Sequence, residues 1–562
     1  MSILKFKEAN CKNCYKCIRN CPIKAIELKN DQAQIIEKEC VLCGSCVLVC
    51  PQNAKQVRND VHKVIDLIET GQQVIASLAP SFIAEFGVSG IEEFGGYLKQ
   101  LGFAGAYETA EGAYVVKSEY EKLVDEKWNK VIISSCCPTV LNLIQKYHPA
   151  VIGNVAPVIS PMQAHAKILR ERFPDAHIVF IGPCISKKGE VEQYDSDIDV
   201  VLTFEELNEW FGKNNIEIPR NNEVDREKYL SRFFPVSGGI LKTMRKNDDY
   251  HYMVVDGMDN CVDAIREIEN ENLQNCFIEM SACVGSCING PSFRKQGDSR
   301  ILSQIRVADY AKKEGQHRDY DLEYHFETGK QIKDEYIALQ LPSEEKIREI
   351  MKKMGKTKPE DELNCGTCGY PTCYEKAIAV YFGKAEISMC LPYMKEKAES
   401  FSDEIISSTP NAILTVDSNY HIQQINDAAC KLFHIGNPKD VIGREVSVVM
   451  DISTFANVFD TGKNITNQKV YMAEYNMYVE QIFVFDSKSS AVICIMKDIT
   501  QQVEENEKMM QLKNNAAEIA DKVIEKQMRV VQEIASLLGE TTAETKIALT
   551  KMKNTVLMDE EK

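Results

Sequence analysis

Three short cysteine-containing segments, far apart in the chain, constrain its fold more than any other feature. They are SSCCP at 134–138, PCISKKGE at 183–190 and EMSACVGSC at 279–287. The first two follow apolar runs (VIISS and HIVFIG), and the third begins within one (CFIEM). Buried strands deliver residues to one end of a parallel sheet in this way. The sequence therefore predicts that four thiolates from three strand ends, with a lysine beside one of them, hold a buried anionic iron–sulfur centre.

Length, charge and cysteine usage set the broad class of protein. A chain of 562 residues is too long for one hydrophobic core, so several domains are expected. With 66 basic and 83 acidic residues the net charge is −17, which argues against a nucleic-acid or anionic-membrane surface. The 21 cysteines gather in Cys-x-x-Cys clusters, which indicates metal ligation in a reducing compartment. A polar start and the lack of a long apolar stretch predict a cytoplasmic protein without a signal peptide or membrane span.

The amino terminus carries two runs of four closely spaced cysteines, each followed by a proline. This pattern resembles two-cluster bacterial ferredoxins, in which the fourth cysteine of each run ligates the cluster of the other run. The resemblance implies two 4Fe–4S clusters, one on Cys11, Cys14, Cys17 and Cys50, and the other on Cys21, Cys40, Cys43 and Cys46. Zinc is the alternative, but zinc motifs rarely repeat three spaced cysteines and a Cys-Pro pair.

The three central segments together resemble the signature motifs of iron-only (FeFe) hydrogenases. The likeness covers roughly residues 60–340 and includes PVSGGILKT at 235–243, which is similar to a Ser/Thr-Gly-Gly element of that family. Helical patterns alternate with apolar strands over the same region, which predicts an α/β domain with parallel sheets.

The resemblance implies an H-cluster, in which a 4Fe–4S cube is joined through a cysteine to a diiron unit bearing carbonyl, cyanide and a dithiolate. Lys187 would donate to a cyanide, because an ammonium group is costly to bury without such an anion. Cys136 would be the first proton acceptor. The ligands of the cube, the last of which bridges to the diiron unit, would be Cys137, Cys184, Cys283 and Cys287. Further residues at cofactor-contacting positions are Ala79, Pro80, Ser160 and Ser281.

The chain departs from the family along the proton path. Ala156 stands where a relay serine is expected, and only Glu119 or Glu121 could supply one of two relay glutamates. Three residues near the motifs also differ from those usual in the family. Val140 stands in place of tryptophan, Met162 in place of glutamine, and Ser281 in place of methionine. Losing one positioned acid–base group typically costs about 10²–10⁴-fold in rate. The sequence therefore predicts a site that assembles and binds H₂ but turns over slowly.

A further cysteine set follows a charged stretch near residues 343–361. Its spacing resembles the single 4Fe–4S domain of corrinoid iron–sulfur proteins and of redox-driven membrane complexes, and its members are Cys365, Cys368, Cys373 and Cys390. Zinc remains an alternative here, because four cysteines alone do not fix the metal. Gly366, Gly369 and Pro371 favour a cluster, since loops that wrap a cluster need unusual backbone turns.

The last part of the chain changes character. Residues 401–500 resemble a PAS sensor domain, through NDAACKLF at 426–433 and the closing DIT at 498–500. Cys430 and His434 could ligate a PAS cofactor of unknown identity, although packing is the commoner role of such residues. From Gln501 apolar residues recur every seven positions, which predicts a long helix. That helix either lies solvated on its own protein or pairs with a second copy of the chain.

These patterns predict a multidomain chain of α/β and α+β character. The expected domains are a two-cluster ferredoxin-like domain at 1–58, the hydrogenase domain at 59–342, a small helical 4Fe–4S domain at 343–399, a PAS domain at 400–500, and a C-terminal helix at 501–562.

Two functions fit this organisation. The first is a low-turnover hydrogenase that senses H₂ or cluster redox state, and its resemblance to sensory FeFe hydrogenases implies a kinase or phosphatase partner. The second is a metabolic hydrogenase that exchanges electrons with ferredoxin and is modulated by the PAS domain. A third, an electron-transfer scaffold without the diiron unit, is disfavoured by Lys187 and the Cys136-Cys137 pair.

Overall fold

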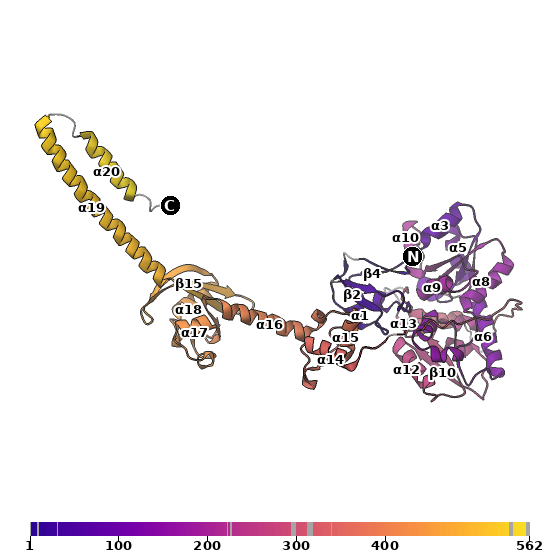
Figure 1. Cartoon of the computed structure of the whole chain (residues 1–562). Coiled ribbons are helices and arrows are strands. Elements are labelled where there is room, and N and C mark those ends of the chain that lie inside the picture. Colours follow the sequence, from indigo (N-terminus) through magenta and orange to yellow (C-terminus); the bar gives the residue numbers. More distant parts are fainter. Residues whose placement is uncertain are drawn as a thin grey trace. The chain divides into compact units, whose positions relative to one another are not determined.

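The computed structural model describes residues 2–7, 10–30, 32–221, 223–224, 227–293, 299–311, 318–338, 340–538 and 543–557. The chain divides into two compact units, Met1–Tyr393 and Met394–Lys562. Figure 1 shows the order of their helices and strands along the chain. No described helix is both long enough and apolar enough to cross a bilayer.

The amino-terminal segment is built from short strand pairs and one-turn helices. Two antiparallel pairs form, β1 with β4 and β2 with β3. Tyr15 and Gly44, both in the left-handed conformation, precede the two helices, and each helix carries the third cysteine of its run. The elements are β1 (Leu4–Phe6), α1 (Lys16–Arg19), β2 (Ile26–Lys29), β3 (Gln32–Ile35), α2 (Ser45–Leu48) and β4 (Lys55–Val57).

The region that follows contains two parallel sheets, as the sequence predicts. One has the strand order β6-β5-β8-β9, and the other has the order β10-β11-β7. The strands are β5 (Val74–Leu78), β6 (Gly105–Glu108), β7 (Val131–Ile133), β8 (His177–Gly182), β9 (Val200–Thr203), β10 (His251–Asp256) and β11 (Cys276–Ser281). Every residue of β5 is buried, as expected for a strand covered on both faces.

Helices connect these strands. The first two cysteine segments follow β7 and β8, and the third begins within β11, so the segments come from both sheets rather than from one. The helices are α3 (Val61–Glu69), α4 (Phe82–Phe86), α5 (Ile91–Gln100), α6 (Ala110–Asp125), α7 (Pro138–Tyr147), α8 (Pro161–Arg172), α9 (Ser186–Gln193), α10 (Phe204–Lys213), α11 (Gly239–Thr243), α12 (Met258–Glu269) and α13 (Arg300–Ala311).

The first unit ends with a small helical segment. α14 (Glu344–Lys353) packs on α15 (Cys373–Tyr381) around a core that includes Ile347, Met351 and Ala377. The next helix, α16 (Leu391–Ser408), begins directly after Cys390.

The second unit contains an antiparallel sheet with the order β13-β12-β16-β15-β14, as expected for the PAS domain. Asn426 caps the short helix α17 by accepting from the backbone of Ala429, so the NDAACKLF segment begins that helix. The elements are β12 (Ala412–Asp417), β13 (Ile422–Ile425), α17 (Asp427–Leu432), α18 (Ser453–Thr461), β14 (Ile465–Met472), β15 (Met477–Asp486), β16 (Ala491–Asp498), α19 (Thr500–Leu538) and α20 (Ala543–Leu557).

Candidate metal centre

The three cysteine segments meet at a cavity of about 100 Å³ with mostly apolar walls. Cys136, Cys137, Cys184, Cys287 and Lys187 line it. Cys283 does not line the cavity but lies between Ser281 and Ser286, which do, and the Ser286 N–H donates to its carbonyl at 2.8 Å. The structure therefore brings together three of the four cysteines that the sequence assigns to one cube and places the fourth in the adjoining loop.

Local structure fixes the direction of these thiols. Cys137 is the N-cap of α7, and Pro138 occupies the first position of that helix, which a proline favours. Cys184 precedes α9 and accepts a hydrogen bond from the backbone N–H of Lys187. Helix N-termini favour negative charge, so both sulfurs are placed where a thiolate is stabilised.

The donor set fits an iron–sulfur cluster. Burial raises the pKa of Cys184 to about 12 and that of Cys287 to about 11, and nearby thiolates add to both shifts. Burial also raises the pKa of Cys283 well above its ordinary value. Buried thiols with such pKa values need bound cations to become thiolates, and iron is a cation that thiolates prefer.

Lys187 lies in a buried ionic network at the edge of the cavity. Its Nζ donates to Glu190 Oε2 at 2.6 Å, and Lys330 Nζ donates to Glu190 Oε1 at 2.7 Å. Burial alone would lower the pKa of Lys187, but the charge of Glu190 raises it. Burial would raise the pKa of Glu190, yet the two lysines lower it to about 2. Two ammonium groups against one carboxylate leave an excess positive charge, which suits an anionic cofactor.

The other predicted contact residues divide into two groups. Ala79, Pro80 and Ser281 line the cavity. Ser160 does not belong to its lining but lies behind it, where its hydroxyl donates to Glu190 at 3.2 Å and caps α8. The structure therefore places Ser160 in the network that supports Lys187.

Ser81 is a residue that the sequence reasoning missed. It is fully buried, it lines the cavity, and its hydroxyl has no hydrogen-bond partner among the described residues. Buried polar groups are normally paired, so an unpaired hydroxyl at this position fits a polar ligand in the cavity. The sequence feature that could have identified Ser81 is its position directly after Ala79 and Pro80.

Tyr120 is the second missed residue, and it contacts Cys136. The Tyr120 hydroxyl lies 3.2 Å from Cys136 Sγ and 2.9 Å from Ser135 Oγ, and it accepts from the Ser135 N–H. Ser135 Oγ donates to the Val158 carbonyl at 2.6 Å, so Tyr120 donates to Ser135 and the Cys136 thiol donates to Tyr120. The hydrogen-bond chain from Cys136 therefore ends at a main-chain carbonyl.

The two candidate relay glutamates point elsewhere. Glu119 accepts from Lys122 at 2.7 Å and from Tyr324 at 2.5 Å, and Glu121 accepts from the backbone N–H of Arg245 at 2.7 Å. Neither is bonded to Cys136. Each is about 100° around α6 from Tyr120, which explains why only the tyrosine reaches the thiol.

One of the two predicted amino-terminal cysteine sets lines a single cavity. Cys21, Cys40, Cys43 and Cys46 line one small cavity, which mixes the fourth cysteine of the first run with three of the second. Of the other predicted set, Cys17 lies in a hydrophobic core against which Cys11 packs, but Cys21 and Cys46 belong to the same core, so this set stays a prediction. The third set, Cys365, Cys368, Cys373 and Cys390, also lines one cavity.

Zinc is the alternative that the sequence leaves open for the ferredoxin-like sets and for the set at residues 365–390. Among the residues with described positions, no three His, Cys, Asp or Glu side chains lie close enough to bind one metal ion. A zinc ion would need its sulfurs about 2.3 Å from one point, whereas a 4Fe–4S cube spaces them farther apart. The assignment of clusters rather than zinc to these sets therefore stays a prediction from the cysteine spacing.

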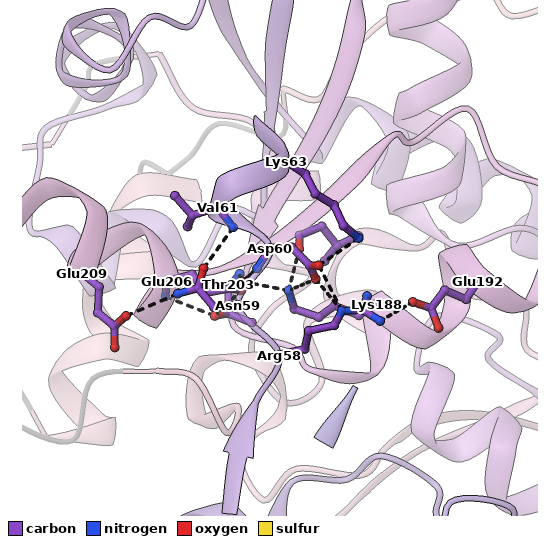
Figure 2. Close-up of polar contacts among 11 residues, drawn as sticks. Arg58, Asn59, Asp60, Val61, Lys63, Lys188, Glu192, Thr203, Glu206 and Glu209 are labelled. Atoms are coloured by element: carbon purple, nitrogen blue, oxygen red, sulfur yellow. Dashed lines mark hydrogen bonds and ion pairs between the residues drawn. The ribbon is translucent and has the colours of Figure 1, made fainter. Parts of the chain in front are cut away.

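A second buried lysine, Lys188, is next to Lys187 in sequence but reaches a different region. Its Nζ donates to Asp60 at 2.8 Å and to Glu206 at 2.9 Å. Arg58 also pairs with Asp60, at 3.0 Å, and with Glu192, at 2.7 Å (Figure 2). This network joins the end of the ferredoxin-like segment to α9 and α10.

Four family models match the chain. They are the iron only hydrogenase large subunit, C-terminal domain, at residues 72–291, the 4Fe-4S dicluster domain at 10–54, an Fe-S cluster model at 361–392, and the PAS domain at 410–501. The central region is therefore similar to the iron-only hydrogenase domain. The chain is thus a hydrogenase-like protein with iron–sulfur cofactors and a PAS domain.

Relatives agree with this assignment. Iron hydrogenase 1 of Clostridium pasteurianum is 24% identical over 281 residues, which cover 40% of this chain and 49% of that protein. The chain therefore spans about half the length of this curated relative.

Two solved structures also resemble parts of the chain. An FeFe-hydrogenase variant from Chlamydomonas reinhardtii has 17% identity and a TM-score of 0.39, and the match covers 46% of this chain and 90% of that one. The PAS domain of nitrogen regulation protein NR(II) from Vibrio parahaemolyticus has 18% identity and a TM-score of 0.16, and the match covers 17% and 97%.

Proposed function

We propose that this protein is a low-turnover hydrogenase that senses H₂ or the redox state of its clusters. Cys137, Cys184, Cys283 and Cys287 would hold the cube of an H-cluster, Cys287 would bridge to the diiron unit, and Lys187 would donate to a cyanide of that unit. When held by these residues, such a cofactor would supply the chemistry that splits H₂ reversibly into two protons and two electrons. Ala79, Pro80, Ser81 and Ser281 would form the wall around it.

The sensor proposal rests on where the hydrogen-bond chain from Cys136 ends. Catalysis needs protons to travel between the metal and bulk water. The hydrogen-bond chain that starts at Cys136 passes through Tyr120 and Ser135 and ends at the Val158 carbonyl, which has no proton to donate. With Ala156 in place of a relay serine, slow proton exchange follows, and slow turnover suits detection rather than fuel consumption.

The remaining segments complete the proposal. Residues 1–58 and 343–399 would carry electrons through three 4Fe–4S clusters, residues 59–342 would bind H₂, and residues 400–500 would sense the resulting state. Residues 501–562 would pass the signal to a kinase or phosphatase, or to a second copy of this chain. The exposed apolar side chains along α19, such as Met510, Ile519 and Val530, favour a helical partner.

Film electrochemistry on the anaerobically matured full chain tests this proposal. We expect a measurable catalytic current well below that of efficient hydrogenases, together with tight gas binding. Cys136→Ala should lower the remaining current by about 10²–10⁴-fold, because it removes the first proton acceptor. A wild-type current equal to that of efficient hydrogenases would reject the sensor role.

A metabolic hydrogenase is the second candidate. The intact set of cysteines around the cavity and the two ferredoxin-like cysteine sets favour it, because they would supply electron exchange with an external ferredoxin. Rapid reduction of added ferredoxin by H₂ would support this function over sensing.

A further inference from the structure

The segment that carries Cys365, Cys368, Cys373 and Cys390 packs directly on the ferredoxin-like segment. A single hydrophobic core contains Cys17, Ile18 and Cys21 from the amino terminus together with Cys368 and Tyr370. One backbone hydrogen bond also joins the two segments, because the Leu28 N–H in β2 donates to the Lys384 carbonyl at 2.9 Å. The two cysteine regions therefore share one interior, although about 350 residues separate them in sequence.

Polar contacts fix this packing at the loop that carries Cys368. Arg19 donates to the Thr367 carbonyl at 2.9 Å, and Lys24 Nζ donates to the Gly369 carbonyl at 2.9 Å. Lys24 Nζ also donates to the carbonyls of Ile18 and Arg19, each at 3.2 Å. One ammonium group thus ties the end of α1 to the cysteine loop.

Gly369 permits the close approach. A Cβ atom on this residue would lie 2.9 Å from Ile18 Cγ2 and 3.3 Å from the Arg19 backbone nitrogen. Its φ of +98° is also a conformation that favours glycine. Gly383, in the same segment, has a φ of +71° but open space around it, so only Gly369 serves the contact.

Tyr370 lies at this contact with an unsatisfied hydroxyl. Its side chain is 3% exposed, it lines the cavity of the third cysteine set, and its hydroxyl has no partner among the described residues. Cluster sulfurs accept hydrogen bonds, and such bonds shift the reduction potential. The orphan hydroxyl therefore fits a cluster in this cavity.

The set formed by Cys21, Cys40, Cys43 and Cys46 packs close to the other cysteine sets. Cys43 packs on the same hydrophobic core as Cys137 of the central cavity. Cys21 and Cys46 share a second core with Cys17 and Cys368, and Lys384 Nζ pairs with Glu39, the residue before Cys40.

We propose that the cluster on Cys21, Cys40, Cys43 and Cys46 is an electron junction, and that it exchanges one electron directly with the cluster on Cys365, Cys368, Cys373 and Cys390. The electron that one cluster loses reduces the other by one unit, with no proton moved and no bond broken. Tyr370 donates its hydroxyl to the second of these clusters. This inference rests on the cluster assignments of the proposed function, and it gives electrons a path toward the carboxyl-terminal segments that avoids Cys11, Cys14, Cys17 and Cys50.

Electron paramagnetic resonance of the dithionite-reduced full chain tests the junction. Dithionite supplies the electrons, so the result is independent of H₂ binding and of hydrogenase activity. We expect magnetic coupling between the third cluster and an amino-terminal cluster in the wild type. The coupling should persist in Cys14→Ala, which disrupts the other amino-terminal cluster. Loss of the coupling in Cys14→Ala would overturn the direct contact.

A pair of glycine variants tests the contact between the loop that carries Cys368 and the ferredoxin-like segment. Gly369→Val should abolish the coupling, because the new side chain collides with Ile18. Gly383→Val should retain the coupling, because Gly383 also has a positive φ but has open space around it. Coupling that survives Gly369→Val, or is lost equally in both variants, would overturn the proposal.

A conservative variant covers the case in which Gly369→Val fails to bind its cluster. Tyr370→Phe keeps the ring but removes the hydroxyl, so the potential of the third cluster should shift downward while the amino-terminal potentials stay unchanged. An unchanged third potential in a redox titration would contradict the role of Tyr370.

Discussion

Lys187 and Lys188 are adjacent in α9 and both are buried, yet they complete different kinds of network. Lys188, which is 2% exposed, meets two carboxylates, Asp60 and Glu206, and protein groups alone satisfy it. Lys187 shares the single carboxylate of Glu190 with Lys330. The first network is therefore closed within the protein, whereas the second leaves positive charge beside the cavity.

This difference separates a structural role from a functional one. Buried charges are tolerated when they are paired, so the network of Lys188 needs nothing further. The network of Lys187 becomes balanced only when an anion occupies the cavity. Of these two neighbouring lysines, Lys188 joins the ferredoxin-like segment to α9 and α10, and Lys187 lines the cavity that we propose for the cofactor.

Replacing Lys188 should have the largest effect on stability. Lys188→Met would leave Asp60 and Glu206 with less compensating charge in the interior, and we expect a loss of about 3–5 kcal/mol in unfolding free energy. Lys63→Met is the matched control, because Lys63 pairs with the same Asp60 at 2.9 Å but its side chain is 50% exposed. The control should cost less than about 1 kcal/mol. Equal shifts of the urea midpoint in both variants would show that burial of the network does not matter.

Replacing Lys187 should affect the cofactor more than the fold. Glu190 would keep its partner Lys330, so Lys187→Met should cost about 1–3 kcal/mol in unfolding free energy, less than Lys188→Met. In the matured protein the same variant should weaken or lose the infrared bands of the cyanide ligands. Unchanged cyanide bands in Lys187→Met would remove the distinction between the two lysines.

Removing the Tyr120 hydroxyl should leave turnover nearly unchanged. Tyr120→Phe leaves the Ser135 N–H unpaired, which should cost about 1–3 kcal/mol of stability. Because the hydrogen-bond chain ends at a carbonyl, the catalytic current should fall by less than about tenfold, in contrast to the loss expected for Cys136→Ala. A Tyr120→Phe current as low as that of Cys136→Ala would identify Tyr120 as part of a working relay.

The smallest expected effect is a pH dependence from Asp60. Burial would raise the pKa of Asp60, but Lys188, Lys63 and Arg58 lower it from 3.8 to about 2. A lowered folded-state pKa means that the charge of Asp60 stabilises the fold above pH 4 and that this contribution is lost as pH falls toward 2. In cluster-free protein, the stability difference between wild type and Asp60→Asn should therefore shrink over that range. A constant difference would contradict the pairing.

The sequence predicted the elements that depend on local patterns. Cysteine spacing and apolar strands indicated the parallel sheets and the grouping of Cys137, Cys184 and Cys287. The missed residues are joined by long-range contacts that no periodicity encodes. Tyr120 reaches Cys136 from α6, and Lys330 reaches Glu190 from an irregular segment. Such pairings depend on helix rotation and loop path, which the sequence pattern leaves open.

Infrared spectroscopy of the anaerobically matured full chain, under H₂ and under argon, tests the central claim most directly. We predict carbonyl and cyanide bands in the wild type that change between the two gases, and their loss in Cys184→Ala while the amino-terminal clusters remain. A fully iron-loaded wild type without these bands, or a Cys184→Ala variant that keeps all of them, would contradict the assignment of this cavity.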